Sequence, residues 1–201
     1  MTTALQTVAL LAYPVLVYFA LEFASARVVA LATLALVALR LAFLAPARFA
    51  ATARAFAPAA LALGLASVLT LFWNDPLSLL LAPALLNLAL LAAFAASFLA
   101  RQTTVERLAR AQVGELDADE RRYCRRVTAL WCAFFAANAA VSATLALWGT
   151  REEWTLYNGL VAYVLAGALF AAEYLYRHWR FRRYVGAPTD PFLRRIFPPR
   201  R

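Results

Sequence analysis

Residues 127–148 read VTALWCAFFAANAAVSATLALW, an apolar run without a charged side chain that directly follows Arg125 and Arg126. As an α-helix this run is about 33 Å long, which matches the hydrocarbon core of a bilayer at about 30 Å. Five further runs approach this length: Ala4–Leu21, Val28–Ala45, Ala57–Trp73, Leu79–Ala100 and Trp154–Tyr176. Lipid offers the backbone no hydrogen-bond partner, so each run should be helical. The sequence therefore predicts an all-α polytopic membrane bundle of six transmembrane helices in three hairpins.

The composition points to the same fold class. Of the 201 residues, 64% are hydrophobic and 15% are charged, whereas soluble domains have about 45–50% and about 25%. These values exclude a soluble enzyme, a disordered chain and a disulfide-stapled secreted module. The chain has 20 basic and 11 acidic residues, a net charge of +9. This charge gathers at the ends of the apolar runs, which favours contact with anionic lipid headgroups over binding to nucleic acid.

The arginines are distributed unequally between the two sides of the predicted bundle. With six spans, only Arg27 and Arg151 fall on one side, and the other 18 of the 20 basic residues fall on the side of both termini. The positive-inside rule places that side in the cytoplasm of a bacterial inner membrane. We expect a transmembrane domain at 1–178 with a cytoplasmic loop at 101–126, followed by an Arg-rich tail at 179–201. In an alternative interpretation, Ala24-Ser25-Ala26 is a signal-peptidase site and the first span is removed.

Polar side chains inside the predicted spans form a candidate intramembrane site. The residues are Arg40, Asn87, Asn138 and Glu173. The two asparagines can join helices by hydrogen bonds or contact a substrate. Glu173 can pair with Arg177 one helical turn later, pair with Arg40 at a similar depth, or couple ions to transport. No paired midplane acids or strongly broken helix, which are typical of transporters, are predicted.

Two further groups of residues lie at the ends of the spans. The outer group is an aromatic belt or the lining of an outward-facing polar pocket; it consists of Trp73, Asn74, Asp75, Trp154, Tyr157 and Asn158. The inner group suits anionic headgroups or protein partners; it consists of Arg107, Arg110, Arg121, Arg122, Arg177, Arg180, Arg182 and Arg183. Within the loop, Thr104–Gln112 is predicted to form an amphipathic helix, and Asp117 and Glu120 lie in a charged extension of the fifth span.

No set of residues with catalytic, cofactor-binding or metal-binding spacing is found. His178 is the only histidine, so a multi-histidine motif is impossible, and Cys124 and Cys132 lie eight residues apart without a CxxC pair. GxSxG, P-loop and GxGxxG patterns are also missing from the sequence. We therefore expect a non-enzymatic protein without a cofactor. Gly167 and Ala171 form a small-xxx-small pair that permits close helix packing, inside the protein or in a homo-oligomer.

Short motifs follow one another along the chain in a recognisable order. They are Leu69–Asp75, Val105–Leu108, Gly114–Leu116, Leu130–Phe135 with Asn138, Trp154 with Tyr157, and Tyr176-Arg177-His178. In this order they resemble the bacterial intracellular septation protein A family of inner-membrane proteins, over most of residues 8–178. Val105–Leu108, Gly114–Leu116, Thr155–Gly159 and Glu173-Tyr174 resemble a branch of that family encoded beside acyl-carrier and ketosynthase genes of aryl-polyene-type lipid clusters. Two departures are Asn158, where the family has a basic residue, and the tail 181–201, which extends beyond the usual end.

The resemblance implies an envelope or lipid-pathway accessory or scaffold. It also implies envelope or acyl-lipid biosynthesis proteins as partners, and it supplies no catalytic residue. Two other functions remain open from the sequence. The first is a small transporter or flippase for a lipid-linked or acyl substrate, and the second is an integral-membrane lipid-modifying enzyme.

Overall fold

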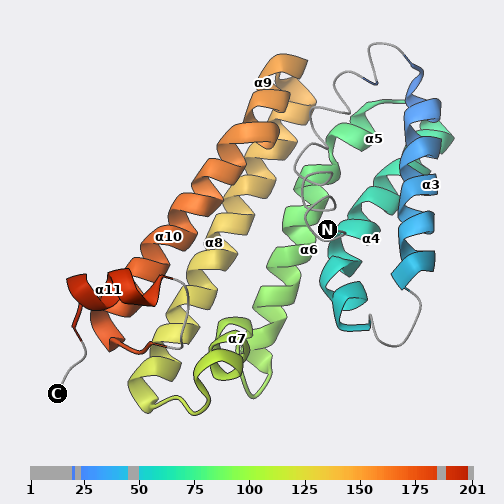
Figure 1. Cartoon of the computed structure of the whole chain (residues 1–201). Coiled ribbons are helices and arrows are strands. Elements are labelled where there is room, and N and C mark those ends of the chain that lie inside the picture. Colours follow the sequence, from blue (N-terminus) through green and yellow to red (C-terminus); the bar gives the residue numbers. More distant parts are fainter. Residues whose placement is uncertain (1–19, 21–23, 45–49, 185–188, 199–201) are drawn as a thin grey trace. The chain divides into compact units, whose positions relative to one another are not determined.

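The structure is a computed structural model that describes residues 20, 24–44, 50–184 and 189–198 (Figure 1). The side chains of residues 36–60 and 62 lie outside this description. Helices form the regular structure throughout the described ranges, and no strand occurs in them. The predicted all-α class is therefore confirmed. The predicted first span, Ala4–Leu21, lies outside the described residues except for Ala20.

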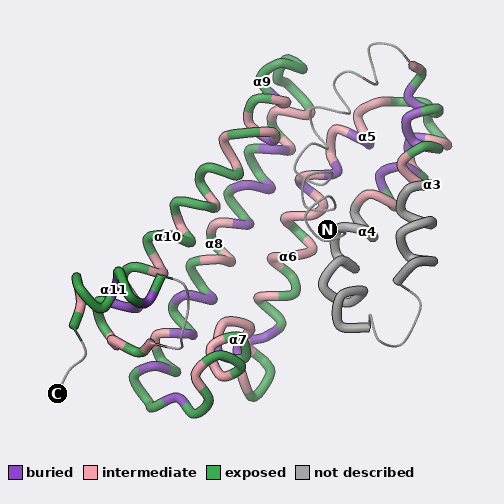
Figure 2. The backbone as a smooth tube through the Cα atoms, viewed as in Figure 1, coloured by how far each residue is buried: buried purple, intermediate pink, exposed green. Residues whose placement is uncertain are grey.

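Three helical stretches are long and apolar enough to cross a membrane: Ala82–Leu99, Ala118–Trp148 and Arg151–Phe181. Shorter apolar helical segments are found at Ala26–Ala35 and Leu63–Trp73. In the last of the three long stretches, only 6% of the most apolar 18-residue segment is buried inside the protein. Figure 2 shows how much of these helices is exposed. Exposed apolar surface of this extent needs an apolar surrounding, which indicates a membrane protein.

The chain divides into two compact units. The first unit comprises Met1–Leu91 and Phe135–Tyr163, and the second comprises Ala92–Phe134 and Val164–Arg201. In the first unit, α3 (Ala26–Leu44) packs against α4 (Ala50–Trp73), and α4 is followed by the short helix α5 (Leu77–Leu80). The second unit contains α7 (Thr104–Val113) and α11 (Asp190–Ile196). The helices α6 (Ala82–Ala96), α8 (Ala118–Trp148) and α10 (Ala162–Phe181) have residues in both units.

The apolar helix predicted at Leu79–Ala100 is present as Ala82–Leu99, and its N-terminal end is less regular than expected. The structure ends α5 at Leu80, begins α6 at Ala82, and finishes the segment with a 3-10 turn at Ser97–Leu99. Pro83 lies in the first turn of α6, where its missing backbone N–H leaves no intrahelical bond unmade. The interruption at Leu81 is slight, because this residue keeps helical backbone angles and its N–H donates to the Leu77 carbonyl.

The last predicted span, Trp154–Tyr176, is likewise longer and less regular than expected. The structure begins α9 at Arg151 (Arg151–Leu156), passes through a π-helical turn at Tyr157–Val161, and continues as α10 to Phe181. Thr150 starts α9 with a capping box, because its hydroxyl accepts from the Glu153 N–H and the Glu153 carboxylate accepts from the Thr150 N–H.

The helical elements predicted within residues 101–126 are confirmed. The helix expected at Thr104–Gln112 is α7, and the charged extension of the fifth span is the first part of α8. Thr103 caps α7 by accepting a hydrogen bond from the Glu106 N–H at 3.4 Å. Gly114 ends α7 with a φ of +77°, a conformation that only glycine adopts without strain.

Replacing Gly114 by alanine should destabilise the loop, because the new Cβ forces an unfavourable φ on the turn between α7 and α8. We expect Gly114→Ala to lower the free energy of unfolding by about 1–3 kcal/mol. Thermal unfolding of the purified protein in detergent measures this loss. Gly167→Ala is the matched control, because Gly167 lies in a helix and its added Cβ meets nothing within 4 Å. Equal melting temperatures for the two variants would contradict the assignment.

Candidate functional site

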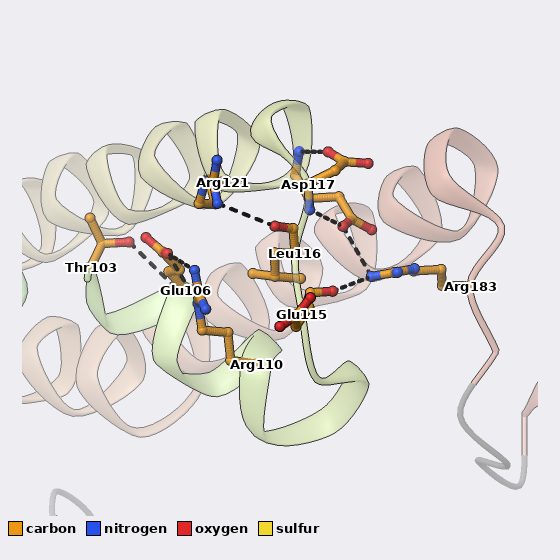
Figure 3. A network of polar contacts seen from close by, with 9 residues as sticks. Thr103, Glu106, Arg110, Glu115, Leu116, Asp117, Arg121 and Arg183 are labelled. Carbon is orange, nitrogen blue, oxygen red and sulfur yellow. Dashed lines mark hydrogen bonds and ion pairs between the residues drawn. The ribbon is translucent and has the colours of Figure 1, made fainter. Parts of the chain in front are cut away.

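An ion pair joins the segment after α10 to the start of α8 in the second unit (Figure 3). The Arg183 Nη1 donates to Glu120 Oε2 at 3.0 Å and to the carbonyl of Glu115 at 2.9 Å. Glu120 is 6% exposed, so its carboxylate is held in a poorly solvated place and needs these partners. Because one guanidinium contacts both the turn before α8 and α8 itself, it links the tail to the folded loop.

Glu120 also caps α8. The Glu120 N–H donates to Asp117 Oδ1 at 2.8 Å, and the Asp117 N–H donates to Glu120 Oε2 at 2.9 Å. This reciprocal pair is a capping box with aspartate in the cap position. Arg121 adds a bond from its Nη1 to the Leu116 carbonyl at 3.4 Å. The sequence Asp117-x-x-Glu120 therefore fixes both the start of α8 and the position of the acceptor for Arg183.

Glu173 forms a second polar cluster on α10. It accepts from the Tyr123 hydroxyl at 3.2 Å and pairs with the Arg177 Nε at 3.3 Å. Burial and the charge of Glu173 raise the pKa of Tyr123, so this hydroxyl remains a donor. Of the two expected partners of Glu173, Arg177 is thus present. The side chain of Arg40 lies outside the description.

A cavity of about 350 Å³ opens beside these two clusters in the second unit. It combines apolar side chains with three basic residues, Arg177, His178 and Arg183, and one acid, Glu120. The remaining lining residues are Ala109, Gln112, Val113, Leu116, Tyr123, Cys124, Phe170, Tyr174 and Phe181. The walls come from α7, the first part of α8 and the last part of α10, so the cavity exists only when the loop and the tail are both folded.

His178 is buried at 5% exposed surface and is held between two tyrosines. Its Nδ1 lies 2.8 Å from the Tyr174 carbonyl, and its ring contacts those of Tyr174 and Tyr184 with centroids 4.3 and 5.8 Å apart. Tyr184 also donates to the carbonyls of Leu193 and Phe197 at α11. The only histidine of the chain therefore connects the cavity to the C-terminal helix.

The other arginines of the inner group have different surroundings. Arg110 pairs with the buried Glu106 at 3.0 Å, and Arg182 donates to the Pro198 carbonyl at 2.8 Å. Arg180 is exposed and lies over the Phe181 ring at 5.5 Å. Arg107 reaches Thr104 Oγ1 at 3.5 Å, and Arg122 is exposed on α8. Arg177 and Arg183 are thus the two arginines of this group that line the cavity.

The first unit contains a separate buried polar network. The Tyr157 hydroxyl donates to Asn138 Oδ1 at 2.7 Å, and the Ser142 hydroxyl donates to Asn158 Oδ1 at 2.7 Å. The Trp154 indole donates to the Leu80 carbonyl at 2.9 Å, at the end of α5. These bonds join α8 to the π-helical turn and join α9 to the interrupted helix before α6. Hydrogen bonds of this kind stabilise the packing of neighbouring helices.

The sequence-predicted sites are therefore regrouped in the structure. Asn138 of the intramembrane set bonds to Tyr157 of the outer set, whereas the Asn87 amide bonds to the Pro83 carbonyl of its own helix. Trp154 and Asn158 are buried. Trp73, Asn74 and Asp75 are exposed, and Asp75 Oδ1 accepts from the Leu77 N–H at 2.9 Å in the turn before α5.

Several residues of these clusters were not singled out from the sequence. Ser142 follows Asn138 by four residues, a spacing that places both on one helix face, and it was a usable signal. Tyr123 gave no signal, and Cys124 was considered only together with Cys132, because only the tertiary fold brings these two residues to Glu173 and to the cavity.

No family model, curated protein or solved structure matches this chain. Within the described residues, no group of three or more His, Cys, Asp or Glu side chains could hold a metal, and both cysteines are free thiols. The function must therefore be argued from the geometry of the second unit, where basic side chains, an aromatic cluster and a cavity come together.

The reactivity of the Cys124 thiol depends on its surroundings in this cavity. It precedes the apolar run that begins at Val127, is 4% exposed, and has its pKa raised by burial to about 11. Because the thiol stays protonated near neutral pH, alkylation of Cys124 in a Cys132→Ala variant should be slow. The rate should rise about tenfold per pH unit between about pH 7 and pH 9.5. Unfolded protein is the control, and a plateau of the folded protein near pH 9 would contradict the buried environment.

Proposed function

We propose that this chain is a multi-pass protein of the bacterial inner membrane, with six spans and both termini in the cytoplasm. We further propose that it is a non-enzymatic accessory or scaffold of an envelope or lipid pathway. The apolar helices and the concentration of arginine on one side support the first statement. The resemblance of the sequence motifs to septation protein A-like proteins supports the second.

The observation that carries the proposal is the Arg183–Glu120 ion pair with its contact to Glu115. Through it, the loop 101–126 and the tail form one folded basic end rather than two separate flexible segments. Such an end presents arginines in fixed positions, and Arg107, Arg122 and Arg180 are exposed on it. A rigid basic surface next to apolar helices suits the binding of anionic headgroups or acidic partner proteins.

The hydrogen-bonding of the first unit gives less support to a transporter. A substrate path requires polar groups that face an open route through the helices. Here Asn138, Ser142 and Asn158 are 3%, 1% and 4% exposed, and each bonds to a neighbouring side chain. We therefore favour the accessory role, with this network as the packing between helices.

The orientation is tested by single-cysteine variants in a background with Cys124→Ala and Cys132→Ala. We expect Arg122→Cys to react with a membrane-impermeant maleimide only after the cells are opened. Arg151→Cys should react from the periplasm in intact cells, because the positive-inside rule places it on the outer side. Reaction of both variants from the same side would contradict the proposed topology.

The accessory role is tested by purification from native membranes in mild detergent, with bound proteins and lipids identified by mass spectrometry. We expect envelope or acyl-lipid biosynthesis proteins to be recovered with the unmodified chain. Recovery should fall at least about tenfold with Arg107→Ala/Arg122→Ala, because these arginines are exposed and neither pairs with a carboxylate in the described structure.

Arg151→Ala is the matched control, since Arg151 is also exposed but precedes α9 in the first unit. It should retain the partners. Equal recovery with the double variant and with Arg151→Ala would remove the support for a scaffold that acts through its basic end.

A further inference from the structure

The cavity of the second unit has the size and composition of a ligand site. Its volume of about 350 Å³ lies within the usual range for small-molecule sites, about 300–1,000 Å³. Phe170, Phe181 and Leu116 supply an apolar wall, whereas Arg177 and Arg183 supply positive charge and hydrogen-bond donors. A ligand that complements both parts must itself be amphiphilic, with an anionic head and an apolar chain.

The two arginines keep donors available for such a head. A guanidinium has five N–H donors. Arg183 makes both of its hydrogen bonds through Nη1. Arg177 donates through Nη1 to Gln112, whereas its Nε lies 3.3 Å from Glu173 Oε1 in an ion pair without a hydrogen bond. In the described structure, the Nε and Nη2 of Arg183 and the Nη2 of Arg177 therefore have no assigned acceptor. Glu120 and Glu173 hold the two side chains in place, which reduces the entropy lost when a ligand binds.

A phosphate group fits these donors better than a carboxylate does. Phosphate has several acceptor oxygens and suits simultaneous bonds from two guanidinium groups. His178 lines the same cavity, and its Nδ1–H donates to the Tyr174 carbonyl, so the donors for the phosphate come from the two arginines. The adjoining helices are apolar and exposed. In the proposed membrane location, lipid acyl chains surround these helices and lie next to the cavity.

We propose that this cavity binds a phosphate-bearing amphiphile, with the phosphate at Arg177 and Arg183 and the acyl chain against Phe170 and Phe181. The ligand is a phospholipid with an exposed phosphate or a soluble acyl phosphate, which share this chemistry. This ligand proposal rests on the proposed membrane location, and it specifies which class of ligand the basic end binds. It does not depend on protein partners, so failure of one proposal leaves the other standing.

The test uses protection of Cys124, which lines the cavity, in the full-length Cys132→Ala protein purified in detergent. The thiol is modified with a small methanethiosulfonate while a probe is present. Dioctanoyl phosphatidic acid should slow the modification at least about tenfold at saturation, because the bound chain covers the thiol. Dioctanoyl phosphatidylcholine, whose phosphate is shielded by choline, should change the rate less than about twofold.

Two further probes distinguish the sources of the ligand. Octanoyl phosphate should protect if the site accepts a soluble acyl phosphate, and protection by phosphatidic acid alone assigns the site to a membrane lipid. Either result supports the proposal. Protection by inorganic phosphate as strong as that by phosphatidic acid would overturn the role of the apolar wall, and no protection by either acyl probe would overturn the site.

Variants of α10 and the segment that follows it locate the phosphate. Arg177→Gln and Arg183→Gln should each weaken protection by phosphatidic acid about tenfold or more, as expected for the loss of a charge-assisted bond. Arg101→Gln is the matched control, because Arg101 is exposed in the second unit and does not line the cavity. In this control variant, phosphatidic acid should protect Cys124 as strongly as it does in the parent protein.

Arg183→Gln also removes the partner of Glu120 and can unfold the tail, so Arg177→Gln is the deciding variant. Its own ion pair with Glu173 is separate from the Arg183–Glu120 bridge. Thermal unfolding confirms that each variant is folded. Equal protection in Arg177→Gln and Arg101→Gln would overturn the placement of the phosphate.

Discussion

Backbone N–H and C=O groups find no partner in hydrocarbon, and this constraint explains most of the regular structure of the chain. The long apolar stretches at Ala82–Leu99, Ala118–Trp148 and Arg151–Phe181 are helical throughout. Where the helices are interrupted, the polar groups are satisfied by other means. The Trp154 indole donates to the Leu80 carbonyl at the end of α5. Hydrogen-bond satisfaction thus governs both the helices and their interruptions.

The Arg183–Glu120 ion pair has the corresponding role at the basic end. Glu120 is buried, and its carboxylate serves the capping box of α8 and the ion pair at the same time. Removing Arg183 would leave the buried Glu120 carboxylate without its ion-pair partner, which costs more than the pair itself contributes. The aromatic contacts of His178 and Tyr184 then bring α11 to the same place. The cavity and the proposed accessory role both depend on this folded end.

Sequence reasoning succeeded where the signal was local. The positions of α7 and of the charged extension of α8 follow from capping residues and from apolar spacing, and both were predicted closely. It failed at the break near Leu81 and at the π-helical turn Tyr157–Val161. Side-chain bonds from other helices meet both interruptions, Trp154 to the Leu80 carbonyl and Tyr157 to Asn138, and hydropathy alone does not reveal them.

The sequence by itself determined that the chain is helical, apolar and strongly basic at one set of segment ends. Length, hydropathy and charge are properties of each segment, so they can be read without knowing its neighbours. The tertiary structure alone decided that Glu173 contacts Tyr123 and Arg177, and that Arg177, His178 and Arg183 surround a cavity. These residues come from α8, α10 and the segment after it, and only the folding of loop and tail together brings their side chains within bonding distance.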